Sequence, residues 1–444
     1  MFKRKIYDRM VSWKEEEKRS VLIIEGAGGV GKTSTVEEFG KNEYGSYIRI
    51  DLSKKSRSME GMLLDCQSDP MGFVVRLQAM TGRKLIPYDG LVILDSIQEI
   101  QCARQAMHSI RSECHLDCIG VFSKTSRGMT LEKTQTCQGE TVLEMLPMDF
   151  EEFLWARGDS VSVPILRTIF DGRESLGGGS CRVMMDRFSD YMAVGGMPQA
   201  VERFLSTGNF MEAEKVKRMI LRSYGACIGR LSGILGRRVS QVFDGIPSNL
   251  SSRSRMFSPC KVESGSRNRQ YRRAVEWLEA AGLINVCIRE DDPDRIGADA
   301  ERGSRPKCYF LDTGLLVTLA SGFDTDVARG MYLSITKGRF SAGGGMFFEN
   351  VVAQELKAHG HDLVFTVFRH KDVTTRYEVD FLIPGSGKIS PIEVKSSASS
   401  RHKSLDVFME KFGTRTDTAY VIHSKDLRVD GKVVYLPIYM TMFL

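Results

Sequence analysis

The chain has 444 residues, of which 42% are hydrophobic and 27% charged, and its formal net charge is +6. This composition is typical of a globular protein and excludes a wholly disordered chain, a collagen-like chain and a coiled-coil rod. No run approaches the roughly 18 apolar residues of a membrane span, and the N-terminal segment lacks the apolar core of a secretory signal. We therefore expect a cytoplasmic protein without a membrane partner.

The first third of the chain alternates short apolar runs with helical patterns. The runs are typical of buried strands in a parallel sheet and lie at 21–25, 47–51, 91–95, 118–122 and 142–146. Crossover helices are expected between them, for example at 33–39 and 71–80. The pattern predicts an α/β domain over residues 1–150.

Three further parts follow. A helical extension is predicted over 151–225, with helices at 150–156 and 201–211 and a Gly-rich break at 177–179. A winged-helix-like domain is predicted over 226–325, because a helix near Trp277 precedes strands at 283–288 and 308–311. Residues 326–444 return to an α/β pattern, with helices at 347–356 and 405–412 and strands at 364–368, 377–383, 390–395 and 419–422.

A phosphate-binding loop is predicted at GAGGVGKT, which fits the pattern G-x-x-x-x-G-K-[ST] between a strand and a helix. Glycines let the backbone amides turn inward around phosphate oxygens, and the following helix offers its positive end. We expect Lys32 to reach the β- and γ-phosphates and Thr33 to ligate Mg²⁺. The predicted ATP-binding residues are Gly26, Gly28, Gly29, Val30, Gly31, Lys32, Thr33 and Ser34.

Asp95 ends an apolar strand and is the candidate acid for holding Mg²⁺ beside Thr33. Many such ATPases carry a glutamate at the next position, which polarises the attacking water; this chain has Ser96, and the nearest following acid is Glu99. The sequence therefore supports ATP binding better than hydrolysis. Polar residues after the next strand are candidates for sensing the γ-phosphate, namely Ser123, Thr125 and Arg127.

A second candidate site lies near the C-terminus. Glu349 is on a predicted helix, Asp380 on a strand, and Glu393 and Lys395 alternate on another strand, so that their side chains share one face. Crowded carboxylates need a cation, which predicts Mg²⁺ or Mn²⁺ at Asp380 and Glu393. This is the logic of the weak D-x(n)-[DE]-x-K nuclease pattern, in which the metal generates hydroxide and the lysine orients water. Glu378 either joins this site or only shares the strand face.

A basic segment at 230–275 holds ten Arg or Lys residues against two acids. Such a segment favours sequence-independent phosphate contacts, so DNA is a candidate partner here and at the C-terminal domain; a solvated basic surface is the alternative. The arginines that cluster around the expected recognition helix are Arg253, Arg255, Arg267, Arg269, Arg272 and Arg273.

Taken in order, the motifs resemble those of bacterial and archaeal AAA-type ATPases with a C-terminal restriction-endonuclease-like domain. The resemblance covers nearly the whole chain, through GAGGVGKT, LVILDSIQEI, LPMDFEEFL, AVGGMPQAV, YFLDTGLL, FFENVV, YEVDFL, PIEVKSS and YLPIYM. It implies a P-loop parallel sheet, a helical and winged-helix segment and an α/β nuclease-like fold. It also implies that Gly196 and Pro198 lie against adenine. The family usually has Arg-Gln at Gly28-Gly29 and Asp-Glu at Asp95-Ser96.

The leading hypothesis is therefore a Mg²⁺-dependent ATPase, with Lys32 and Asp95 at its centre, coupled to a nucleic-acid-facing module. The alternative is a nucleotide-gated binding switch without chemistry, motivated by Ser96. A third hypothesis is nuclease activity at Glu349, Asp380, Glu393 and Lys395. Assembly into oligomers stays open.

Overall fold

The structure is a computed structural model. It describes residues 1–17, 19–54, 57–126, 139–261, 263, 265, 267–292, 305–338, 344–370, 372–385, 387–396 and 402–444. They form two compact units: Met1–Leu146 with Ala280–Gly282, and Pro147–Glu279 with Leu283–Leu444. Within the described residues, no helix combines the length and apolarity required to cross a membrane.

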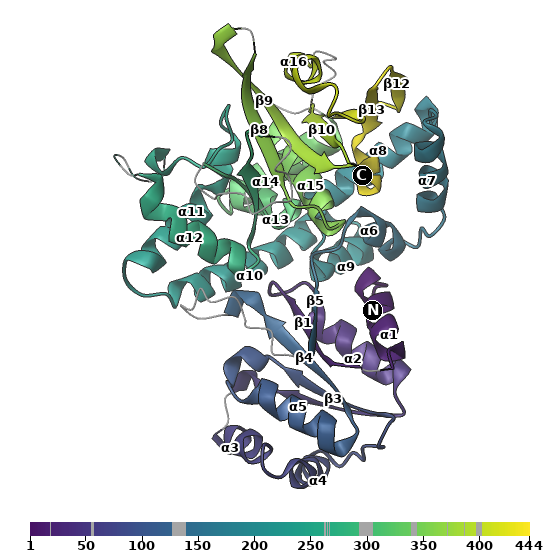
Figure 1. The fold of residues 1–444 in the computed structure, drawn as a ribbon, viewed down its shortest axis with the longest axis vertical. Coiled ribbons are helices and arrows are strands. Elements are labelled where there is room, and N and C mark those ends of the chain that lie inside the picture. The colour runs from purple at the N-terminus through teal and green to yellow at the C-terminus, as the bar shows by residue number, and fades with distance from the viewer. Residues whose placement is uncertain are drawn as a thin grey trace. The chain divides into compact units, whose positions relative to one another are not determined.

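The first unit is a five-stranded parallel sheet in the order β2-β3-β4-β1-β5 (Figure 1). Its strands are β1 (Val21–Gly26), β2 (Ser46–Asp51), β3 (Gly90–Asp95), β4 (Asp117–Ser123) and β5 (Glu140–Glu144). Its helices are α1 (Lys5–Glu15), α2 (Lys32–Glu43), α3 (Arg57–Asp65), α4 (Pro70–Thr81) and α5 (Ala103–Cys114). The predicted α/β class and all five predicted strands are confirmed, although β5 lies two residues earlier than expected.

Alternation along β3 explains why helices cover both faces of this sheet. Val92 and Leu94 belong to one apolar cluster with Ile110 of α5. Ile93 points the other way, because its side chain lies within 3.2 Å of the Cβ position of Gly40 on α2. Every residue of β3 is consequently buried. Asp95 is the last residue of this strand, and it lies at the carboxyl end of the sheet, where parallel-sheet proteins bind ligands.

The second unit begins with helices. They are α6 (Phe150–Ala156), α7 (Ser162–Gly172), α8 (Gly178–Val194), α9 (Pro198–Thr207), α10 (Phe210–Gly229), α11 (Gly233–Leu250) and α12 (Asn268–Ala280). The single helix predicted at 201–211 is wrong, because the chain turns there. Gly208 closes α9 in the left-handed conformation, with φ 64°, and the Asn209 side chain caps α10 by accepting from the Met211 amide.

The second unit continues as an eight-stranded mixed sheet in the order β12-β13-β11-β10-β9-β8-β6-β7. Its strands are β6 (Ile284–Arg289), β7 (Lys307–Phe310), β8 (Val364–His370), β9 (Asp372–Pro384), β10 (Ile389–Val394), β11 (Ala419–His423), β12 (Arg428–Asp430) and β13 (Val433–Pro437). The helices are α13 (Thr313–Ala320), α14 (Thr325–Thr336), α15 (Gly345–Ala358) and α16 (Lys403–Phe412), with a final 3₁₀ helix at Ile438–Phe443.

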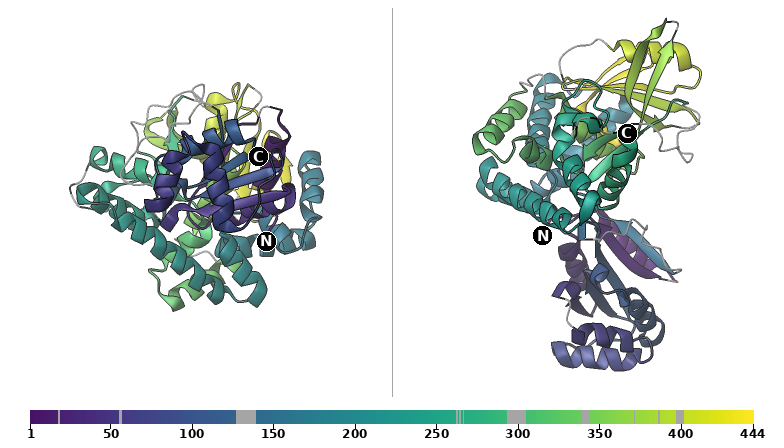
Figure 2. Two further views of the ribbon diagram at one scale, coloured as in Figure 1. Left: turned by 90° about the horizontal axis from the view of Figure 1, so that it is seen from below. Right: turned by 90° about the vertical axis from the view of Figure 1, so that its left-hand side faces the viewer.

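The antiparallel pair β6–β7 was predicted as a wing, and it is part of the same sheet as the C-terminal strands. Ile288 pairs with Val364 in parallel, which joins β6 to β8. Figure 1 shows β8 and β9 as a long hairpin, and the right-hand view of Figure 2 shows the yellow-green strands of this sheet from the side. Continuity across β6 and β8 places side chains of β7, α15 and β9 around one buried point, which is the second candidate site.

Candidate functional sites

The predicted phosphate-binding loop lies between β1 and α2. Gly29 and Gly31 have φ values of 85° and 98°, a left-handed backbone that favours glycine, and α2 starts immediately after them. The Gly28 amide donates to the Thr125 hydroxyl at 2.9 Å. Thr125 follows β4, so the loop is braced by the strand that lies next to β1.

Lys32 is buried, and its ammonium donates to the carbonyls of Gly26 at 2.9 Å and Ala27 at 2.7 Å. Burial lowers the pKa of Lys32 to about 8, against the opposing attraction of Asp95. The ammonium therefore lies across the mouth of the loop on neutral carbonyls. An incoming phosphate would give it a stronger partner.

The structure brings together the two predicted magnesium ligands of this unit. The Thr33 hydroxyl donates to Asp95 Oδ2 at 3.0 Å, across 62 residues of sequence. Ser96 follows in the left-handed conformation, with φ 65°, and its hydroxyl lies 3.5 Å from the other oxygen of Asp95. A hydroxyl and a carboxylate at this separation fit the oxygen shell that Mg²⁺ prefers.

The other candidates near this loop lie as follows. Glu99 is in the 3₁₀ helix Ile97–Glu99 after Ser96. Ser123 ends β4, and its amide donates to the Gln98 side chain at 3.0 Å. Val30 lies in the loop between Gly29 and Gly31, and Ser34 lies in the first turn of α2. Arg127 lies outside the described residues.

Gly196 and Pro198 belong to the second unit. The Gly196 amide donates to Asp312 at 2.6 Å, and its carbonyl accepts from the Met148 amide at 2.7 Å. A Cβ on Gly196 would lie 2.0 Å from the Met148 carbonyl oxygen, so this close backbone approach requires glycine. Pro198 starts α9 at its first position, where no amide donor is needed. Their adenine contact stays a prediction.

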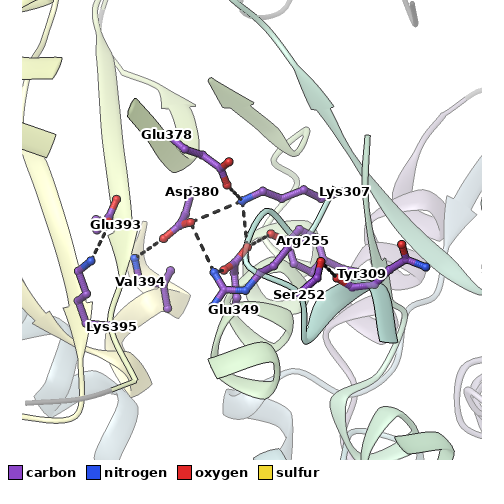
Figure 3. Close-up of polar contacts among 11 residues, drawn as sticks. Ser252, Arg255, Lys307, Tyr309, Glu349, Glu378, Asp380, Glu393, Val394 and Lys395 are labelled. Atoms are coloured by element: carbon purple, nitrogen blue, oxygen red, sulfur yellow. Dashed lines mark hydrogen bonds and ion pairs between the residues drawn. The ribbon is translucent and has the colours of Figure 1, made fainter. Parts of the chain in front are cut away.

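At the second site, Lys307 is the centre of the carboxylate cluster (Figure 3). Its side chain is fully buried at the start of β7, and its ammonium lies 2.8 Å from Glu378, 3.0 Å from Glu349 and 3.5 Å from Asp380. Burial alone lowers the pKa of Lys307, but the three carboxylates outweigh it and raise the pKa above its ordinary value. Lys307 therefore stays charged.

Arg255 is the second cation of this cluster. It follows α11 with φ 49°, and its guanidinium forms an ion pair with Glu349 and lies 3.9 Å from Asp380. The Tyr309 hydroxyl also donates to Glu349. Grouping Arg255 with the DNA-facing surface was wrong, because this side chain turns inward to neutralise buried acids.

Asp380 and Glu393 lie on the neighbouring antiparallel strands β9 and β10. Phe381 faces Ile392, so Asp380 and Glu393 form the next pair along. The Val394 amide donates to Asp380 at 2.9 Å, and Lys395 donates to Glu393 at 2.6 Å. The sequence predicted that Glu393 and Lys395 share one strand face; β10 ends at Val394, one residue before Lys395, and the two side chains are joined by the hydrogen bond.

Burial, followed by repulsion from Asp380, raises the pKa of Glu393 to about 7, although Lys395 opposes the shift. The second carboxylate oxygen of Glu393 is buried and has no hydrogen-bond partner within the described part of the chain. The charge of Glu393 is thus incompletely compensated by the described residues.

Two cations that the sequence did not predict at this cluster, Lys307 and Arg255, each form an ion pair with Glu349. The metal expected at Asp380 and Glu393 stays a prediction. Where side chains are described, no group of three or more His, Cys, Asp or Glu residues is arranged to hold a metal ion. Asp380 and Glu393 remain a pair of adjacent carboxylates, and Glu349 lies among the cations.

The basic segment includes most of α12, whose two faces differ in polarity. Its apolar side is buried through Tyr271, Ala274, Trp277 and Leu278, with the Tyr271 hydroxyl on Gln241 at 2.9 Å. Arg272 is exposed and pairs with Glu276 at 2.9 Å. The remaining exposed arginines in the described part of the segment are Arg230, Arg237, Arg253, Arg267, Arg269 and Arg273.

Sequence reasoning missed Arg49 and Lys307. Arg49 lies on β2 between buried Ile48 and Ile50, and its guanidinium is 2.7 Å from Asp95. Lys307 begins the otherwise apolar strand KCYF. A charged residue within an apolar strand was the available signal, but the partner acids are 46 and 42–73 residues away in sequence.

We predict that Lys307→Met lowers the free energy of unfolding by about 3–5 kcal/mol, because it leaves buried carboxylates without their central cation. Urea denaturation followed by circular dichroism measures this. Lys395→Met is the matched control: Lys395 bonds one acid of the same cluster but is partly exposed, so its loss should cost less than about 1 kcal/mol. Equal losses in the two variants would contradict the central position of Lys307.

We also predict a pH dependence from Glu393. Its pKa is higher in the folded than in the unfolded chain, so the folded state binds more protons between about pH 4.5 and 7 and its stability falls as pH rises through this range. Glu393→Gln removes the effect. Melting temperatures at pH 5 and pH 8 should therefore diverge more for the wild type than for Glu393→Gln, and parallel profiles would show that Glu393 ionises normally.

Three family models match three separate parts of the chain. Residues 18–154 match a family model described as an AAA domain. Residues 185–326 and 344–440 match two models described as domains of unknown function, DUF8612 and DUF4143. No curated protein matches the chain.

Three solved structures show distant likeness. A RuvB variant of Thermotoga maritima has 11% identity and a TM-score of 0.29, covering 66% of this chain and 90% of its own. A STAND protein with a tetratricopeptide repeat sensor from Pyrococcus horikoshii has 12% identity and a TM-score of 0.26, covering 80% and 48%. The Aeropyrum pernix ORC1 protein in complex with DNA has 13% and 0.24, covering 74% and 90%.

With TM-scores below 0.5, these likenesses carry nothing about function. The AAA domain match coincides with the sheet that holds GAGGVGKT and Asp95. The chain is therefore similar to an AAA domain over residues 18–154.

Proposed function

We propose that this protein binds ATP at the loop between β1 and α2 and hydrolyses it slowly with Mg²⁺. The observation that carries the proposal is the 3.0 Å contact between Thr33 and Asp95, directly beside Lys32. These are the three side chains that a P-loop needs at the β- and γ-phosphates, and tertiary structure unites them. The AAA domain match over 18–154 supports the same function.

In this proposal, Thr33 and Asp95 would hold Mg²⁺, which when bound would neutralise the negative charge that develops on the phosphates. Lys32 leaves the carbonyls of Gly26 and Ala27 for the phosphates, because an ammonium binds an anion more strongly than neutral carbonyls. The amides of Gly29, Val30, Gly31 and Ser34 would line the phosphate path, whereas the Gly28 amide donates to Thr125, which would sense the loop through this contact. The adenine contact of Gly196 and Pro198 rests on the sequence resemblance alone.

Turnover is expected to be slow because Ser96 stands where a water-polarising carboxylate is usual. A serine hydroxyl cannot act as a base near neutral pH, so positioning and electrostatic stabilisation have to supply the rate. The alternative function, a nucleotide-gated switch without hydrolysis, is motivated by the same residue.

We predict that Lys32→Ala lowers the affinity for a fluorescent ATP analogue at least tenfold, because the buried ammonium is the principal cation facing the phosphates. Lys41→Ala, an exposed lysine near the end of the same helix, is the matched control and should bind normally. Undiminished affinity in Lys32→Ala would refute the site. Phosphate release by the wild type that disappears in Asp95→Ala would exclude the switch without hydrolysis.

A second candidate function is metal-dependent cleavage of a phosphodiester at Asp380, Glu393 and Lys395. The adjacent placement of these residues favours it, together with the buried oxygen of Glu393 that lacks a hydrogen bond. Asp380 and Glu393 would hold Mg²⁺ or Mn²⁺, which when bound supplies an activated hydroxide. Lys395 would orient water. Glu349 would contribute indirectly, by holding Lys307 and Arg255 beside Asp380.

DNA is the proposed substrate of this second site. Support comes from the exposed arginines of α12 and its preceding loop, which can bind phosphates without reading sequence. Oligomers, common among AAA-type proteins, are compatible with the proposal and are not required by it.

We predict that the protein nicks supercoiled plasmid in Mn²⁺ and that Asp380→Asn and Lys395→Ala do not. Asp380→Asn keeps the side-chain shape while removing the ligand charge. Agarose-gel conversion of supercoiled to open-circle DNA measures the activity. Equal nicking by wild type and both variants would indicate contamination, and no nicking by any protein would leave the cluster without nuclease function.

A further inference from the structure

One oxygen of Asp95 carries more donors than a free metal ligand would. Asp95 Oδ2 accepts from the Thr33 hydroxyl at 3.0 Å, and from Arg49 through Nε at 3.2 Å and Nη2 at 2.7 Å. Asp95 is buried, with 6% of its surface exposed, so few other directions of approach are open. Arg49 thus bonds the carboxylate oxygen that faces Thr33.

The position of Arg49 follows from strand register. β2 and β3 run in parallel, with Arg49 opposite Ile93, so Asp95 is the next residue on the same face of β3. Ile48 and Ile50 point to the opposite face, into the apolar cluster of this unit. Because its two neighbours on the strand are buried on the opposite face, the Arg49 side chain is directed towards Asp95.

A second acidic partner lies within reach of the same guanidinium. Arg49 Nη1 is 3.6 Å from Glu37 on α2, and Arg49 lines a cavity of about 210 Å³ with Glu37 and Asp51. The cavity gives the Arg49 side chain room to move. Arg49 thus has two acceptors: Asp95, which is shared with Thr33, and the Glu37–Asp51 side of the cavity.

We propose that Arg49 is a positioning residue for the nucleotide site, holding Asp95 until Mg²⁺ arrives and then moving to Glu37 and Asp51. The inference rests on the proposed ATP-binding function. Arginine stays protonated at all accessible pH values, so it cannot surrender its charge to accommodate a divalent cation on the same oxygen. Like charges at contact distance repel, and the guanidinium has to move when the ion binds.

This exchange makes Arg49 a competitor of Mg²⁺, so it sets how much Mg²⁺ the site requires. The Arg49–Asp95 pair is partly exposed, with 31% of the arginine side chain accessible, so it contributes about 1 kcal/mol. Removing it should lower the half-saturating Mg²⁺ concentration roughly fivefold. Removing the receiving acid, Glu37, should change that concentration in the opposite direction.

The test is a Mg²⁺ titration of bound N-methylanthraniloyl-ADP fluorescence on the full chain, for wild type, Arg49→Gln, Glu37→Gln and Arg83→Gln. Arg83 is the matched control, because it lines the same cavity but lies over the Tyr47 ring. We expect a lower Mg²⁺ midpoint for Arg49→Gln, a higher one for Glu37→Gln and an unchanged one for Arg83→Gln.

Nucleotide binding with an unchanged or higher midpoint in Arg49→Gln would overturn the role of Arg49 while leaving the ATP site intact. Absence of nucleotide binding in the wild type would instead overturn the proposed function, and this inference with it. Glu37→Gln gives the second measurement in case Arg49→Gln does not fold, and an unchanged or lower midpoint there would overturn the exchange.

Discussion

Both candidate sites depend on matching buried carboxylates with cations that the chain itself supplies. A carboxylate removed from water without a partner is costly enough that it would shift its pKa and become neutral. Asp95 has Arg49, while Glu349 and Asp380 have Lys307 and Arg255. In each case the cation and the acid belong to different elements, so these charges are neutralised only when the tertiary structure brings the elements together.

This pairing gives the two sites different capacities. Asp95 shares its oxygen with an arginine that has a second acidic neighbour, so the cation there can exchange. Lys307 is fully buried, and all three of its acidic partners belong to the same cluster. The first arrangement suits a site that a metal–nucleotide complex enters and leaves. The second suits a permanent centre, next to which one buried oxygen of Glu393 has no hydrogen bond from the described residues.

Helix α15 shows how a polar sequence can serve packing. Asn350 bonds the backbone of Phe310 in both directions, Gln354 accepts from Thr313, and Glu355 accepts from Tyr191. These side chains are buried, and their partners lie on three other elements, β7, α13 and α8. The family motif FFENVV therefore has a structural explanation at Asn350, and Glu349 is the residue of this helix that reaches the charged cluster.

The local elements were readable from the sequence because their causes are local. Buried strands appear as apolar runs, and the pattern of GAGGVGKT requires a glycine-permissive bend before a helix, which the φ values of Gly29 and Gly31 confirm. The two strands that carry Asp380 and Glu393 were also predicted, and their antiparallel pairing places these two residues side by side. The turn at Gly208 was missed because a single glycine can also lie within a helix.

Tertiary structure alone decided which charges meet. Nothing near Arg49 in sequence marks Asp95 as its partner, since their contact arises only when β2 lies beside β3. Arg255 was indistinguishable from its exposed neighbours until the chain reversed after α11 and directed it to Glu349. Propensity and periodicity act over a few residues, whereas charge compensation acts through space, so the sequence determined the strands and the phosphate loop and the fold determined the ion pairs.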